Sequence, residues 1–207
     1  GCDPDWEERS TQVRWDPAGD FWDLPMPSDL RIESDGTWNL EQWPGDWNAS
    51  MVAMWLAAGE EALGGKWGLS SGVFMTVNGQ LDRSSLPANS AASITPNSSV
   101  ILVDIDSGSA EFGRRFPLEV TFDDIGDLYV PPNVLAAVPA PGFVRRPNTR
   151  YALVVFDSVK DKAGAPIGRS QAFHNAFEDI DGDARAIDNF KALREALDQL
   201  GLDAEHV

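Results

Sequence analysis

One stretch decides the fold: Pro147-Asn-Thr-Arg-Tyr-Ala-Leu-Val-Val-Phe156, then Asp157-Ser-Val-Lys-Asp-Lys-Ala-Gly-Ala-Pro-Ile167, then Gly168-Arg-Ser-Gln-Ala-Phe173. It contains a Pro-Asn turn, six residues typical of a strand, a charged turn that ends at Gly164, and a second extended run from about Pro166. We therefore predict two strands joined by a corner.

The first of these strands is apolar on both faces. Side chains alternate across a strand, so one face carries Tyr151, Leu153 and Val155, and the other carries Ala152, Val154 and Phe156. Such a strand has to be covered on both sides. Tyr151 stands at its start, where a tyrosine can bury its ring while its hydroxyl bonds to the preceding turn.

Further short strands are predicted on both sides of this stretch. They cover residues 73–77, 99–105, 112–122, 128–130 and 134–138, and Pro117 marks an edge or a bulge within the third. Clusters of Gly, Pro and Asp separate them, with no helix between most of them. This pattern predicts a mainly β fold, an antiparallel sandwich rather than a parallel sheet.

Several short motifs resemble known bacterial domains. The pattern Pro-x-Thr-x-Tyr-x-Leu-x-Val from Pro147, followed by Val-x-Asp-x-x-Gly-x-Pro-Ile from Val159, resembles the closing hairpin of bacterial Ig-like domains of surface and S-layer proteins. Together with Pro25-Met-Pro-Ser-Asp-Leu30, Asp35-Gly-Thr-Trp-Asn-Leu40, Gly68-Leu-Ser-Ser-Gly72 and Leu81-Asp-Arg-Ser-Ser-Leu86, residues 16–200 are similar to the N-terminal domain of bacterial virulence-factor lipases and related exported lipoproteins. The resemblance implies an Ig-like fold and an exported location. It carries over no catalytic residue, because those lipases hold their active site in a later domain.

The charge balance excludes some partners. A formal net charge of −17 and a pI near 4.3 disfavour nucleic acid and anionic membrane surfaces, which would repel the chain. Acidic surfaces serve solubility, and they can also bind calcium through oxygen ligands. No cofactor other than calcium is suggested.

The single cysteine, Cys2, cannot form an intramolecular disulfide. The Gly1-Cys2 pair looks like the mature end of a bacterial lipoprotein, whose thiol carries the lipid. We therefore expect lipid attachment at Cys2, membrane association only through that anchor, and a location at the bacterial outer membrane or cell surface. The alternative is that Gly1 is a remnant of cloning and Cys2 a chance thiol.

All eight tryptophans lie in the first third of the chain: Trp6, Trp15, Trp22, Trp38, Trp43, Trp47, Trp55 and Trp67. We expect this tryptophan-rich arm to cover the outer face of the sheet, because the two-faced strand needs a second cover. In the alternative, exposed rings such as Trp43 and Trp47 form a platform for a sugar or a peptide.

Two helices and three regions complete the prediction. Residues 48–63 and 184–200 have helical apolar spacing and end at Gly64 and Gly201. The expected regions are an N-terminal tether at 1–20, the Ig-like sandwich with its arm and helix at 21–175, and a C-terminal helical extension or linker to a following domain at 176–207.

Two motifs suggest chemistry. Residues 68–72 match the G-x-S-x-G nucleophile elbow, with Ser70 as nucleophile and His174 or His206 as base, but a helix precedes and a strand follows, the reverse of the required order. Asp179, Asp181 and Asp183 are candidate calcium ligands, although their spacing does not fit an EF-hand. For both motifs we favour a turn or a helix cap.

The sequence therefore predicts a non-catalytic, exported Ig-like module that serves adhesion, spacing or scaffolding, as the leading domain of a larger protein. Its partners would be cell-envelope proteins or glycans. A carbohydrate- or peptide-binding module that uses exposed tryptophans is the alternative, and a hydrolase that uses Ser70 and His174 is the weaker one.

Overall fold

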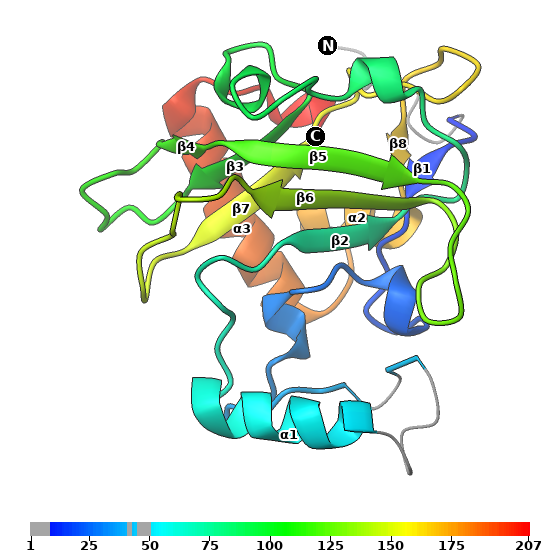
Figure 1. Ribbon diagram of the computed structural model, residues 1–207. Coiled ribbons are helices and arrows are strands. Elements are labelled where there is room, and N and C mark those ends of the chain that lie inside the picture. Colours follow the sequence, from blue (N-terminus) through cyan, green and yellow to red (C-terminus); the bar gives the residue numbers. More distant parts are fainter. Residues whose placement is uncertain (1–8, 41–42, 45–50) are drawn as a thin grey trace.

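The computed structural model describes residues 9–40, 43–44 and 51–207, and it is mainly β, as predicted. Its described residues form eight strands and three α-helices, together with several short 3-10 turns. Figure 1 shows the layers: one sheet in front, a second sheet behind it, and helices behind the second sheet.

The strands form two antiparallel sheets and one parallel pair. The front sheet has the order β2 (Val73–Thr76), β6 (Val134–Pro139), β5 (Leu118–Asp123), and the rear sheet has the order β4 (Arg115–Phe116), β3 (Val100–Asp104), β7 (Tyr151–Val155). The parallel pair consists of β1 (Gln12–Val13) and β8 (Gly168–Arg169).

Pro117 is the corner that joins the two sheets. It is the one residue between β4 and β5, so the chain leaves the rear sheet and enters the front sheet at this point. Proline has no N–H to give to a ladder, which favours a break there. Its carbonyl accepts a hydrogen bond from the Ala140 N–H at 2.8 Å, which ties the corner to the end of β6.

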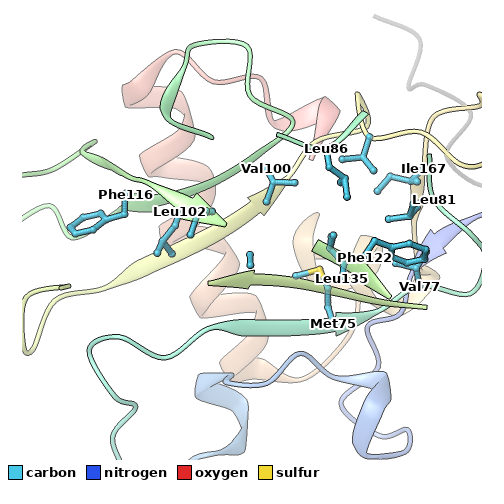
Figure 2. Packing of buried hydrophobic residues seen from close by; sticks show 13 residues of the cluster. Met75, Val77, Leu81, Leu86, Val100, Leu102, Phe116, Phe122, Leu135 and Ile167 are labelled. Carbon is cyan, nitrogen blue, oxygen red and sulfur yellow. The ribbon is translucent and has the colours of Figure 1, made fainter. Parts of the chain in front are cut away.

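The main core lies between the two sheets. Figure 2 shows side chains of this core, which include Leu102 and Phe116 from the rear sheet and Met75, Phe122 and Leu135 from the front sheet. Loops close the core with Leu81, Leu86, Val159 and Ile167. Burial of these side chains is the main stabilising term of such a domain.

Helices cover the other face of the rear sheet. α2 (Gln171–Phe177) and α3 (Ala184–Leu200) contribute Phe177, Leu193 and Leu197 to a second core with Ile101, Val103 and Val154. The prediction of a double cover is therefore correct, but the prediction that the tryptophan-rich arm supplies the second cover is wrong. The amphipathic stripe of α3 does so together with α2, because its apolar residues pack on those of β3 and β7.

The described tryptophans have other roles. Trp15 is buried and packs on Phe173 and Phe190 beside the helices, with ring centroids 5.8 and 5.3 Å away. Trp38 and Trp67 stack at 5.0 Å and lie next to α1 (Met51–Leu63). Trp55 on α1 is 70% exposed, so this ring does not cover a sheet.

The Tyr151 side chain behaves as predicted. Its ring meets Phe116 edge-on, with centroids 5.3 Å apart, and its hydroxyl accepts a hydrogen bond from the Arg146 N–H at 2.9 Å. The hydroxyl therefore fixes the turn that precedes β7.

The second half of the deciding stretch differs from the prediction. The run from Pro166 to Phe173 holds only the two residues of β8, which pair with β1 and not with β7, and then α2 begins. Ser170 is the reason for the helix, because its hydroxyl caps the N–H of Phe173 at 3.2 Å. The two strands therefore do not form a β-hairpin.

The hydrophobic cores extend across the boundaries of the three regions expected from the sequence. Residues 9–20, assigned to a tether, contain β1 and the buried Trp15, and the expected boundary at residue 175 falls inside α2. Residues from 176 onward supply half of the second core. In the described part of the chain, the arm, the sheets and the terminal helices share their cores.

This packing makes a stability prediction. Leu197→Ala should lower the free energy of unfolding by about 2–5 kcal/mol, because it removes a fully buried side chain between α3 and the sheet. Trp55→Ala removes an exposed ring and should change it by less than about 0.5 kcal/mol. Urea denaturation measures both. A larger loss for Trp55→Ala than for Leu197→Ala would contradict the assignment of the second cover to the helices.

Candidate functional site

A cleft of about 310 Å³ runs along the outer edge of β7. Its size lies at the lower end of the range for ligand sites, roughly 300–1,000 Å³. Its lining comes from strand β7, strand β2 of the front sheet, helices α2 and α3, and the segment from Pro25 to Leu30. The pair β1 and β8 and residues 205–207 also contribute to it. Residues far apart in the sequence therefore meet there.

The outer edge of β7 has no partner strand among the described residues. β7 is the last strand in the order β4, β3, β7, and no isolated bridge pairs with it. At one end of the ladder the Ile105 N–H bonds to the Arg150 carbonyl, and at the other the Phe156 N–H bonds to the Ser99 carbonyl. Hydrogen-bonded pairs alternate in antiparallel sheets, so Ala152 and Val154 also bond to β3.

The backbone groups of the alternate residues of β7 point away from β3. The N–H and C=O groups of Tyr151, Leu153 and Val155 face away from β3, toward the cleft. No backbone hydrogen bond joins these groups to another part of residues 9–40, 43–44 or 51–207. The cleft thus has a row of backbone donors and acceptors along one side.

The walls on both sides of this row are apolar. Toward the front sheet they include Val73 and Met75 of β2, next to Leu102 of β3, and toward the helices they include Trp15, Phe173, Phe190 and Leu193. The aromatic rings of the second wall pack on one another, with 4.9 Å between the centroids of Phe173 and Phe190. This wall is therefore held in place without a ligand.

A buried arginine holds the segment that closes the cleft. Arg31 donates hydrogen bonds to the carbonyls of Phe21 and Leu24, and its guanidinium lies 4.2 Å from the centroid of the Phe21 ring. Burial lowers the pKa of Arg31 to about 10, which still leaves it charged at neutral pH. Arg31 satisfies these carbonyls, and Met26 forms an isolated antiparallel bridge with Phe74 of β2, so the chain near Pro25 is held on both sides.

The charges at one end of the cleft neutralise one another. The Asp157 carboxylate accepts hydrogen bonds from the Arg9 guanidinium at 3.1 Å and from His206 Nδ1 at 3.0 Å. Arg169 donates to the Glu205 carbonyl at 3.0 Å and lies 3.4 Å from the Glu178 carboxylate. Residues 205–207 are thereby tied to the end of β7.

The Ser70 motif forms a turn, as predicted. It follows α1 and precedes β2, so the order of elements is the reverse of a nucleophile elbow. Arg145 donates hydrogen bonds to the carbonyls of Gly68, Leu69 and Ser71, so this turn presents carbonyls to a cation. His206, one of the two candidate bases, bonds to Asp157 instead.

The acidic loop before α3 also serves local structure. The Asp183 carboxylate caps α3 by accepting hydrogen bonds from the N–H groups of Arg185 and Ala186, and the Asp181 carboxylate accepts one from the Gly182 N–H. In the part of the chain that the structure describes, no group of three His, Cys, Asp or Glu side chains could hold a metal ion. Calcium binding by Asp179, Asp181 and Asp183 stays a prediction.

The other predicted site residues are not brought to the cleft. Trp43 is half-buried and packs on Phe21, with ring centroids 5.0 Å apart. Trp47 and Cys2 lie outside the described residues. A platform of Trp43 and Trp47 and lipid attachment at Cys2 therefore stay predictions.

The cleft itself was not predicted from the sequence. β7 was expected to be a strand that needs two covers, but its edge was assigned no role. Part of the signal was present in the sequence, since Tyr151, Leu153 and Val155, which share one face of β7, all line the cleft. What was missing was the strand order, which places β7 at the end of its sheet.

Residues 205–207 should hold the end of β7 more firmly at lower pH. The hydrogen bond to Asp157 and the charge of that carboxylate raise the pKa of His206 above its ordinary value. The charged ring therefore stabilises the folded state fully below about pH 6.5, and this contribution disappears as the pH rises through the raised pKa. The melting temperature should fall across that range, and His206→Gln should reduce the fall. If His174→Gln removed it instead, the assignment to His206 would be wrong.

Comparisons with known proteins give no relative from which a function of the site could be inferred. No protein-family model matches the chain, and neither the search of curated proteins nor the search of solved structures finds a match. Among the described residues, no helix is long and apolar enough to cross a membrane.

Proposed function

We propose that the protein is a non-catalytic binding module of an exported bacterial protein, and that its ligand occupies the cleft beside β7. The observation that carries this proposal is the combination of apolar walls with a row of unpaired backbone groups in one cleft of the described chain. Ligand sites typically combine an apolar lining with a few directed polar groups. A spacer or scaffold needs no such cleft, so we favour binding among the roles predicted from the sequence.

The surroundings of the cleft support a site that exists before the ligand arrives. The aromatic wall packs on itself, Arg31 holds the segment near Pro25, and Asp157 is paired with Arg9 and His206. A preformed site loses less conformational freedom on binding. Hydrolysis gains no such support, because the Ser70 turn directs carbonyls toward Arg145.

The Ig-like relationship, the lipid at Cys2 and the location at the cell envelope belong to the same proposal. The two antiparallel sheets and the hydrogen bond from the Arg146 N–H to the Tyr151 hydroxyl support an Ig-like relationship. The helices packed on the rear sheet are an addition to that pattern. The Gly1-Cys2 pair supports the anchor, which would present the cleft to proteins or glycans of the envelope.

A fluorescent apolar probe tests the cleft directly. Nile red, an uncharged dye, should gain emission with the wild-type protein, because the apolar walls shield it from water. Val73→Trp should remove most of the gain by filling the cleft, whereas Val138→Trp, on the outward face of β6, should keep it. Equal loss in both variants would contradict a binding role for the cleft.

A further inference from the structure

We infer that the ligand is an extended polypeptide segment that adds to the outer edge of β7 as a further strand. This inference rests on the proposed binding role of the cleft and goes further, because it names the chemical class of the ligand and the groups that hold it. Strand addition of this kind is an established way for sheets to bind peptides, with the main chain supplying affinity and side-chain pockets supplying selectivity.

The backbone of β7 decides between a peptide and other apolar ligands. The N–H and C=O groups of Tyr151, Leu153 and Val155 face the cleft without a partner in the described ranges. An acyl chain or an aromatic ring would cover these groups and leave them without hydrogen bonds, which costs roughly 1–3 kcal/mol for each buried group. An extended peptide presents alternating donors and acceptors at the matching spacing, so it satisfies the row.

The walls define the side chains of the added strand. Its alternate residues would point toward Val73 and Met75 on one side and toward Phe190 and Leu193 on the other. β3, on the opposite edge of β7, lies between the same two layers, and its residues Val100 to Val103 are apolar on both faces and almost completely buried. The segment that fits should therefore be apolar at successive positions, as β3 is.

The charge of the protein indicates which residues should stand beside the apolar part of the ligand. The Asp157 carboxylate already forms hydrogen bonds with Arg9 and His206, so the ligand needs no charged group at this end of the cleft. Outside the cleft, the net charge of −17 attracts cations over a distance of about one Debye length, roughly 8–10 Å at physiological salt. The ligand class is thus a short apolar strand with basic residues beside it.

A peptide that copies β3 tests the inference. The probe is a fluorescein-labelled peptide with the sequence Ser-Val-Ile-Leu-Val of residues 99–103 and two lysines at each end, and fluorescence anisotropy measures its binding to the wild-type protein. The peptide should bind. N-methylation of every amide should weaken binding by about tenfold or more, because it removes all donors, whereas methylation of alternate amides leaves one edge free to pair. Equal binding of the fully methylated peptide would overturn the inference.

A matched pair of variants tests the edge from the protein side. Leu153→Pro removes the N–H that faces the cleft and breaks no bond to β3, so an edge strand should tolerate it. Leu153→Ala removes the side chain and keeps the N–H. We expect the proline variant to bind the peptide at least about threefold more weakly than the alanine variant. Equal affinities of the two folded variants would overturn the inference, and the methylated peptides decide the matter if the proline variant does not fold.

The outcomes separate this inference from the proposed function. If Nile red binds in the cleft and no peptide competes, the strand inference fails and the binding role stands. Displacement of the probe by lauric acid but not by the peptide would likewise overturn the inference, in favour of an acyl-chain ligand. If neither probe nor peptide binds, the proposed function itself fails.

Discussion

The whole structure depends on the need to shield two strands that are apolar on both faces. Every residue of β3 is buried, and Val100, Ile101 and Val103 have no exposed surface. The front sheet shields one face and helices α2 and α3 shield the other, so a three-layer arrangement follows from the composition of these strands. The corner at Pro117 brings the front sheet over the rear one, and the Ser170 and Asp183 caps start the two helices where they can cover it.

Strand β7 is shielded from water less completely than β3. Residues 152 and 154 face the helices and are buried, whereas Tyr151, Leu153 and Val155 are only partly covered. An edge strand with unpaired backbone groups tends to associate with other chains, so proteins usually block such edges. Here the chain near Pro25 and residues 205–207 limit access to the edge, and they leave a cleft rather than an open flank. The incomplete shielding of β7 therefore accounts for the cleft and for the binding role that we propose for it.

Individual elements could be predicted from local signals in the sequence. Continuous runs of apolar, strand-forming residues located β3 and β7, apolar spacing and Gly201 located α3, and Pro117 marked a break. The predictions were wrong where the outcome depends on competition between distant segments. Tryptophans and helices were both available as a second cover, and the apolar stripe on α3 supplies it. α2 was missed because the run before it was taken as a strand, although Ser170 is a typical cap. The cleft depends on strand order, which no local pattern encodes.

Amide hydrogen exchange along β7, followed residue by residue by NMR, tests the central claim most directly. The account predicts slow exchange for Ala152 and Val154, whose N–H groups bond to β3, and exchange at least about tenfold faster for Leu153 and Val155, whose N–H groups face the cleft. Equal protection of all four amides would show that another strand already occupies the outer edge, and it would contradict both the open edge and the role proposed for it.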